Sequence, residues 1–179
     1  AKGEKSFILI FGRTVDGKRI AVIDENYEPY FYVIPKEAIL GRKLTSKLER
    51  LSFKFKDKLI FVKRTEIVQK RLLGKEIAAI KVFLNDAKGA NKIKDYIKTF
   101  DEVLKIYELD IPVYRRYLID KKITPLLLTT VDGEEIQENY DVDLIIKSNK
   151  IEPKENTLIK NPKMLAFEIE VYNQRRYPN

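Results

Sequence analysis

The sequence predicts an α+β fold: a mostly antiparallel sheet with two to three helices, arranged as a ferredoxin-like core with hairpin extensions. Short β-favouring segments follow one another across tight turns, which is typical of antiparallel hairpins. Two amphipathic helical patterns interrupt these hairpins, whereas a doubly wound parallel sheet would alternate strands and helices regularly. The chain has 179 residues and no cysteine, so it has the length to bury a sizeable core and needs no disulfides to fold.

Three strands and one helix are expected in the first third of the chain. Residues 7–11 and 19–24 flank the turn Asp16-Gly17 and predict a hairpin, and residues 29–34 predict a third strand that ends at Pro35. Between residues 36 and 51, apolar side chains recur every three or four positions. This spacing predicts an amphipathic helix that Gly41 interrupts or delays.

Three further strands and a second helix follow. Residues 59–62, 66–70 and 77–84 are rich in branched and aromatic side chains, and Gly74-Lys75 supplies a turn between the last two segments. Residues 87–100 carry one apolar stripe with lysines around it, which predicts a helix.

The last third begins with a helix signal. Asp110 is suited to cap a helix that has Pro112 in its first turn and runs to about residue 121. Residues 126–131 and 140–147 predict a hairpin-like region with a turn at Asp132-Gly133. Polar residues 148–156 predict a linker or loop, and residues 163–171 a final strand.

Composition limits the chemistry available to the chain. The sequence contains no Cys, His or Trp, which excludes Cys/His zinc sites and nucleophiles activated by histidine. Residues 41–98 hold 17 Lys and Arg against 6 Asp and Glu, within a total net charge of +8. Such a region favours a polyanion such as nucleic acid, and the alternative is the solvated, highly charged surface of a thermophilic protein. Apolar stretches are too short to cross a bilayer, so we expect a cytoplasmic protein with no membrane partner.

Two carboxylates near the end of the chain are candidate metal ligands. Glu168 and Glu170 are two positions apart, so on a strand both side chains point to the same face. Paired carboxylates of this kind can hold Mg²⁺ for phosphoryl transfer. The alternative is a half-exposed strand with an acidic outer face.

An aromatic and basic cluster is the candidate nucleic-acid site. Tyr114-Arg115-Arg116-Tyr117 lies on the third predicted helix and approaches Pro29-Tyr30-Phe31-Tyr32 only if the fold brings the two segments together. Arginine for phosphate and tyrosine for base stacking are the usual means of binding single strands. Alternatively, Arg116 and Asp120 form an ordinary i,i+4 ion pair and Tyr114 belongs to the core.

Four segments, in this order and spacing, resemble the start of an archaeal family B DNA polymerase, and the similarity covers nearly the whole chain. They are Glu28-Pro29-Tyr30-Phe31-Tyr32, Val68-Gln69-Lys70-Arg71-Leu72-Leu73-Gly74, Tyr107-Glu108-Leu109-Asp110-Ile111-Pro112 with Arg116-Tyr117-Leu118-Ile119-Asp120-Lys121, and Leu165-Ala166-Phe167-Glu168-Ile169-Glu170. The resemblance implies a template- and uracil-binding domain over residues 1–125, a hairpin and linker region over 126–162, and the first strand of a truncated 3′-5′ exonuclease domain over 163–179.

The same resemblance implies that the domain binds single-stranded template DNA and captures template uracil ahead of polymerisation. The uracil pocket would include Pro29, Tyr30, Ile111, Pro112 and Arg116. A flipped base needs a tight apolar slot, and a nearby cation can hold the flanking phosphate. The chain departs from the family pattern at Ala87, Ala90 and Val113, which implies a wider and shallower pocket.

Glu168 and Glu170 resemble the first exonuclease motif, in which two acids bind the catalytic metals, but the family has aspartate where this chain has Glu168. The longer side chain implies impaired exonuclease activity in the parent polymerase, which uses Mg²⁺. No complete catalytic set lies in this chain, so we expect it to be inactive alone and to bind no metal tightly. We expect a truncated piece or one part of a split enzyme, whose partners are template DNA, the rest of the polymerase and, through the parent, a sliding clamp. Two alternatives are a small Mg²⁺-dependent nuclease and a stand-alone nucleic-acid-binding module.

Overall fold

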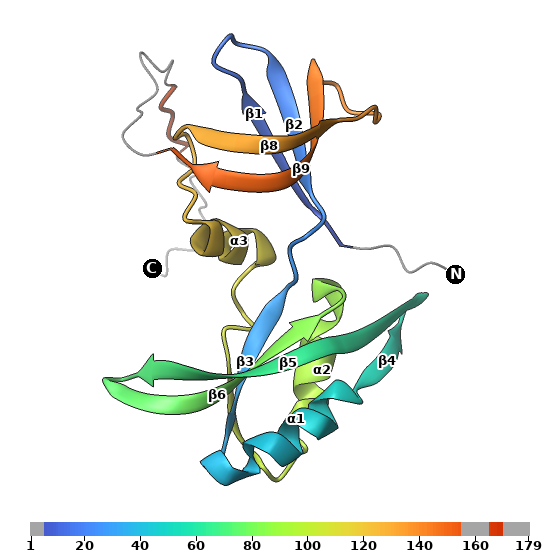
Figure 1. Cartoon of the computed structure of the whole chain (residues 1–179), viewed down its shortest axis with the longest axis vertical. Coiled ribbons are helices and arrows are strands. Elements are labelled where there is room, and N and C mark those ends of the chain that lie inside the picture. Colours follow the sequence, from blue (N-terminus) through green and yellow to red (C-terminus); the bar gives the residue numbers. More distant parts are fainter. Residues whose placement is uncertain (1–5, 155–164, 170–179) are drawn as a thin grey trace, which may run out of the picture.

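Two sheets, drawn at opposite ends of the molecule in Figure 1, make up most of the fold. The computed structural model describes residues 6–154 and 165–169. In the first sheet, β1 (Ile8–Arg13) and β2 (Arg19–Asp24) form an antiparallel hairpin, and Gly17 takes a positive φ of 91° in its turn. β9 (Leu144–Pro153) lies parallel to β2, and β8 (Thr129–Glu135) pairs antiparallel with β9. The strand order is therefore β1-β2-β9-β8.

The second sheet has the βαββαβ order of a ferredoxin-like unit. Its elements are β3 (Tyr30–Pro35), α1 (Gly41–Glu49), β5 (Lys58–Leu72), β6 (Lys75–Leu84), α2 (Ala90–Ile97) and β7 (Val103–Tyr107). β4 (Ser52–Phe55) pairs with β5, which gives the strand order β4-β5-β6-β3-β7 with every pair antiparallel. The predicted fold class is confirmed, including the ferredoxin-like core.

The main core lies between the five-stranded sheet and its two helices. Side chains at spacings of four on each helix are fully buried, namely Leu44 and Leu48 on α1 and Ile93 and Ile97 on α2. They pack against alternate residues of β3, β5 and β6, among them Phe31, Val33, Ile60, Ile80 and Val82. Each helix follows a short 3-10 turn, Ala38–Leu40 before α1 and Ala87–Gly89 before α2. The predicted effect of Gly41 is confirmed, since α1 begins at that residue.

A third helix, α3 (Val113–Lys121), lies between the two sheets in Figure 1. Tyr117 is its buried anchor: its side chain is 1% exposed, and its hydroxyl donates to the Oδ2 atom of Asp24 at 2.9 Å. Lys121 reaches the same carboxylate at 3.6 Å, and the ring of Tyr27 meets that of Tyr117 edge to face at 5.1 Å. These contacts fix α3 against the end of β2.

Several predicted elements of the last third are wrong in detail. The helix begins at Val113 with Pro112 at its N-cap, not at Asp110. Asp132-Gly133 forms an irregularity inside β8 and not a turn, and residues 148–153 continue β9 where a linker was expected. The physical reason is tertiary: residues 148–153 pair with β8, and this pairing buries Ser148 and Ile151 within a segment that is otherwise polar.

Other differences concern strands. Residues 58–72 form one continuous strand where two were expected, and β4 and β7 were not anticipated. Residues 165–169 have no regular secondary structure, and Leu165, Phe167 and Ile169 are 87%, 77% and 75% exposed, so this part of the expected final strand is wrong. The rest of that strand, including Glu170, lies outside the described residues, as does 155–162 of the expected linker region. None of the helices in the described ranges is long and apolar enough to span a membrane.

Candidate nucleic-acid interface

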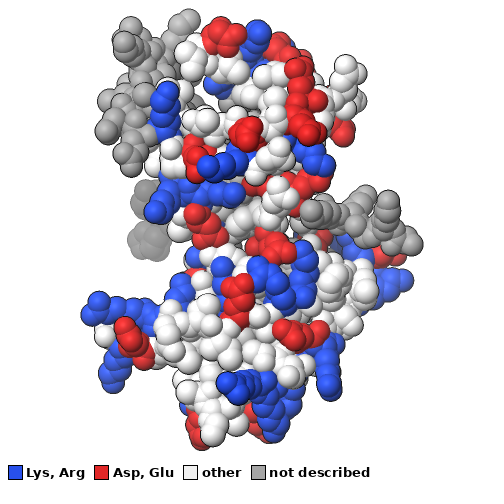
Figure 2. Space-filling model, viewed as in Figure 1, with Lys and Arg blue, Asp and Glu red and all other residues white. Residues whose placement is uncertain are grey.

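Side chains that point away from α1 and α2 cover the second face of the five-stranded sheet. Because strand residues alternate, this face receives Tyr30 and Tyr32 from β3, Phe83 from β6 and Tyr107 from β7. Four cations lie over these rings: Arg64 and Lys70 from β5, Lys81 from β6 and Lys105 from β7. We call these eight residues the aromatic face. Figure 2 shows that Lys and Arg side chains are frequent over this half of the molecule.

Strand register places the rings beside one another. Phe83 is the cross-strand partner of Tyr30 on one side and of Arg64 on the other. In the next row, Tyr32 lies opposite Lys81 and Tyr107. The Tyr30 ring centroid is 5.5 Å from that of Tyr32 and 5.7 Å from that of Phe83, which is the range of favourable aromatic pairs.

Each cation covers a ring. The guanidinium carbon of Arg64 is 3.5 Å from the Phe83 centroid, and the Lys81 ammonium is 3.8 Å from the Tyr30 centroid. The Lys70 ammonium is 4.2 Å from the Tyr32 centroid. Phe83 and Tyr32 are therefore only 5% and 6% exposed. The outer layer of this face holds these cations, of which Arg64 is ion-paired with Glu28 and Glu66.

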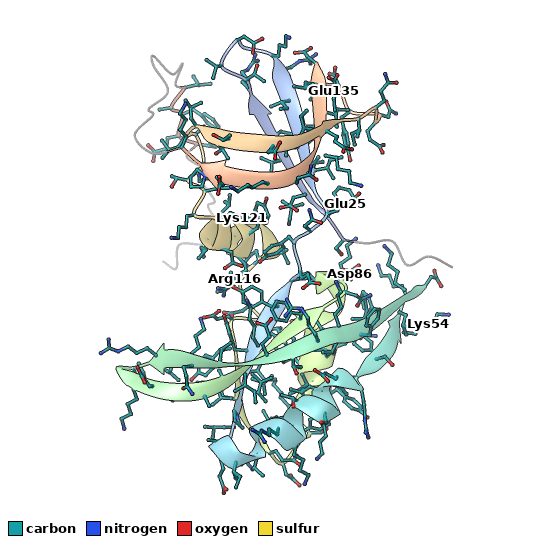
Figure 3. The ribbon with its side chains drawn as sticks, in the orientation of Figure 1. Glu25, Lys54, Asp86, Arg116, Lys121 and Glu135 are labelled. Carbon is teal, nitrogen blue, oxygen red and sulfur yellow. The ribbon has the colours of Figure 1, made fainter. Side chains whose placement is uncertain are left out.

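Tyr30 and Arg116 meet at the end of this face that lies under α3. Figure 3 shows Arg116 on the side of α3 that faces the five-stranded sheet, and its guanidinium carbon is 5.2 Å from the Tyr30 centroid. Arg116 is 8% exposed and donates to the Oε2 atom of Glu108 at 2.5 Å. The Tyr30 hydroxyl donates to the Oδ1 atom of Asp120 at 2.7 Å, and the Tyr27 hydroxyl donates to its Oδ2 atom at 3.1 Å. Arg116 therefore forms its salt bridge with Glu108 and not with Asp120, whose carboxylate accepts hydrogen bonds from the two tyrosines.

This network fixes the protonation of its members. Burial raises the pKa of the Tyr30 phenol, and the hydrogen bond to Asp120 adds to this effect, so Tyr30 stays neutral. Burial opposes the charge of Arg116, but the carboxylates of Glu108 and Asp120 outweigh it and raise the pKa of the guanidinium. The Nε atom of Arg116 is buried without a hydrogen-bond partner. The corner therefore holds a permanent cation.

The other residues predicted for a uracil pocket are distributed around this corner. Pro29 is buried, and its carbonyl accepts from the Leu84 amide at 2.8 Å. It lines a cavity of about 170 Å³ together with Tyr27, Glu28, Lys63 and Asn85, among others, but not with Tyr30 or Arg116. Ile111 is half-buried and Pro112 is exposed, in the segment that enters α3. The structure brings Tyr30 and Arg116 together and leaves the role of the other three as a prediction.

The three positions that depart from the family pattern lie at helix starts. Ala87 begins the 3-10 turn before α2, and Ala90 is the first residue of α2 and packs against the core on the helical side of the sheet. Val113 is the half-buried first residue of α3.

The described residues do not fit a metal centre. Within them, no group of three or more His, Cys, Asp or Glu side chains lies close enough together to hold a metal ion. Glu168 is exposed in the irregular segment 165–169, and its companion Glu170 lies outside the described residues. We therefore derive no step of metal-assisted chemistry for this chain.

Sequence reasoning had selected Tyr30, Tyr32 and the α3 segment but missed most of the aromatic face. Phe83, Lys81, Arg64, Lys70 and Tyr107 were not recognised as site residues. The sequence signal for this face is the two-residue spacing of Lys81 and Phe83, which places both side chains on one face of β6. Tyr30 and Tyr32 have the same spacing on the neighbouring strand β3. Assigning faces to the predicted strands would have separated these residues from the core set.

Comparison with known proteins identifies the family. Residues 104–179 match the family model described as DNA polymerase family B, exonuclease domain. DNA polymerase 2 of Aeropyrum pernix is 28% identical over 185 residues, which cover 99% of this chain and 22% of the relative. The DNA polymerase of Methanocaldococcus jannaschii is 33% identical over 159 residues, which cover 87% of this chain and 8% of the relative.

A solved structure has the same fold. The family B DNA polymerase from the hyperthermophilic archaeon Pyrobaculum calidifontis superposes with a TM-score of 0.65 at 21% identity, over 88% of this chain and 20% of that one. The chain thus spans only about a fifth or less of the length of these relatives. The sequence matches show that this chain belongs to the archaeal family B DNA polymerases and corresponds to an N-terminal domain of such an enzyme.

Proposed function

We propose that this chain binds single-stranded template DNA on its aromatic face and recognises template uracil at the corner formed by Tyr30 and Arg116. It would act as the N-terminal part of a replicative DNA polymerase, with the remainder of the enzyme as its partner. The observation that carries the proposal is the layer of cations stacked on neighbouring aromatic rings. A surface of this kind offers both groups that single strands require, charge for phosphate and flat rings for bases.

The stacked cations are well placed to exchange with bases. A cation–π contact at a partly exposed site contributes about 0.5–1 kcal/mol, whereas a base stacked on an aromatic ring contributes about 1–3 kcal/mol. A phosphate that attracts Lys81 or Lys70 would move that side chain off its ring and expose the ring to a base. Charge neutralisation and stacking would then stabilise the complex together, so binding should weaken steeply with salt.

The corner at Tyr30 supplies the features that reading one flipped base requires. Tyr30 is fixed by its hydrogen bond to Asp120, and Arg116 places a buried cation 5.2 Å from the centroid of the Tyr30 ring. Pro29, Ile111 and Pro112 would supply apolar walls. A slot that fits uracil closely would exclude thymine through its methyl group.

The uracil proposal is tested with matched single strands that differ by one uracil or thymine, measured by fluorescence anisotropy. We expect a preference for uracil that Tyr30→Ala abolishes and Arg116→Lys weakens, because lysine keeps the charge but loses the planar fork. Tyr114→Ala is the matched control, since Tyr114 is a 59% exposed tyrosine on the same helix. Equal affinity of the wild-type chain for both strands would contradict uracil recognition.

The binding surface itself is tested by salt dependence. Lys70→Ala and Lys81→Ala should each lower the slope of log affinity against log salt by about one, whichever base the strand carries. Lys88→Ala is the control, because Lys88 is exposed on the helical side of the sheet, beside α2. If all three variants keep the wild-type slope, the strand does not bind on the aromatic face.

A further inference from the structure

A second hollow lies on the helical side of the five-stranded sheet, between β4 and α2. It encloses about 640 Å³, and we call it the β4–α2 groove. Its lining consists of Arg50, Leu51, Ser52, Phe53 and Lys54 on one wall and Lys92, Ile93, Asp95, Tyr96 and Thr99 on the other. These residues are distinct from the aromatic face, so the groove plays no part in the proposed binding of template.

One wall of the groove is an unpaired strand edge. β4 bonds to β5 on one side only and is the outermost strand of its sheet. Five consecutive residues, from Arg50 to Lys54, line the groove, and three of them belong to β4. An outer edge presents N–H and C=O groups that an added strand can satisfy. In Figure 3, Lys54 lies at the outer margin of the molecule.

The groove has an apolar floor and a basic rim. Leu51, Phe53 and Ile93 belong to the main core or pack against it, and they provide the floor. Tyr96 is 60% exposed above them. Arg50, Lys54 and Lys92 are exposed cations of the lining, whereas its one carboxylate, Asp95, lies 3.9 Å from the ammonium of Lys98.

These features favour one class of occupant. Only an extended polypeptide supplies both donors and acceptors in the spacing of a strand edge, which a nucleic acid does not. A second copy of this chain would bring its own Lys54 and Lys56 against the same residues, and like charges on paired strands repel. We propose that the β4–α2 groove is a docking site for an extended acidic segment of a protein partner, which adds as a strand to β4 and places alternate apolar side chains on the groove floor.

The probe for this test is a fluorescent peptide of about ten residues that alternates glutamate with leucine, titrated with the whole chain at low salt. We expect saturable binding that the double variant Lys54→Glu, Lys92→Glu weakens by about tenfold or more. Both lysines are exposed, so the variant should keep the wild-type circular dichroism spectrum. Lys18→Glu, which reverses the charge of one exposed lysine in the β1–β2 turn, should bind as the wild type does, whereas Lys54→Glu or Lys92→Glu alone should already weaken binding.

Two further probes separate strand addition from simple charge attraction. The same peptide methylated on alternate backbone nitrogens cannot bond to a strand edge, so its affinity should fall by about tenfold. Equal binding of the methylated peptide, or of a peptide with lysine in place of glutamate, would overturn the proposal. A competition experiment gives a further contradicting outcome. If oligothymidine displaces the acidic peptide equally well from the wild type, Lys70→Ala and Lys81→Ala, the oligonucleotide binds in the groove, and the groove is then a nucleic-acid site.

Discussion

Replacing Tyr117 by phenylalanine isolates one buried hydrogen bond that positions α3. The Tyr117 side chain is 1% exposed and Asp24 is 3% exposed, so neither partner can turn to water when the bond is lost. A hydrogen bond to a charged group contributes about 1.5–3 kcal/mol. In the variant, Asp24 still accepts a hydrogen bond from the Asn26 amide at 2.8 Å and still lies 3.6 Å from the Lys121 ammonium. Because the carboxylate keeps these two partners, we expect a loss near the lower end of that range. Phenylalanine fills nearly the same volume, so no cavity adds to the loss.

In a domain of this size, 1 kcal/mol shifts Tm by about 2–4 °C, so a loss near 1.5 kcal/mol should lower Tm by about 3–6 °C. Calorimetry at neutral pH measures this shift. Tyr114→Phe provides the control, because Tyr114 lies on the same helix and is 59% exposed, and its Tm should match the wild type. If Tyr117→Phe and Tyr114→Phe melt together, the bond to Asp24 does not hold α3 in place and the reasoning fails.

Three further outcomes follow from the same structure. Burial, together with the bond to Asp24, raises the pKa of Tyr117 above its unfolded value of 10.0. The neutral phenol therefore stabilises the fold below pH 10, and this contribution is lost as the pH rises above that value. The Tm of Tyr117→Phe should consequently fall less at alkaline pH than the Tm of the wild type. The hydrogen bond from Lys47 lowers the pKa of Glu102 from 4.5 to about 2, so this carboxylate stabilises the fold above pH 4.5 and ceases to do so as pH falls toward 2. Acid titration of Tm should therefore be flatter in Glu102→Gln over that interval. Gly133→Ala should cost about 1–3 kcal/mol in urea unfolding, because the new Cβ would lie 2.2 Å from the Lys147 carbonyl oxygen, and an unchanged midpoint would show that β8 can shift.

Local patterns made much of the fold predictable from the sequence. The four-residue spacing of Leu44 and Leu48, and of Ile93 and Ile97, reports the buried side of each helix directly. The turns between β1 and β2 and between β5 and β6 have glycine at a positive φ, which is a local requirement. The pairing of strands that are distant in the sequence has no such local signal. Nothing near Ile145 in the sequence indicates that it lies beside Ala21 in a parallel pair.

The candidate site divides in the same way. Tyr30 and Arg116 were selected by residue type and by resemblance, but their approach depends on where α3 rests, which the contact between Tyr117 and Asp24 determines. The cation layer depends on register. Arg64 lies opposite Phe83 because the pairing of β5 with β6 shifts after Val62, and a shift of this kind is a property of the assembled sheet.

The path of the chain through its two sheets has a consequence for the order in which they form. Residues 30–107 contain every strand of the five-stranded sheet, including β4. The other sheet takes β1 and β2 from before this interval and β8 and β9 from after it. During synthesis, the ferredoxin-like unit has all its partners once residue 107 has emerged, whereas β2 must wait for β9. β2 ends at residue 24 and β9 begins at residue 144, so the β1–β2 hairpin keeps an open edge while about two thirds of the chain is made. The slow, non-local step of folding is therefore the pairing of β9 with β2.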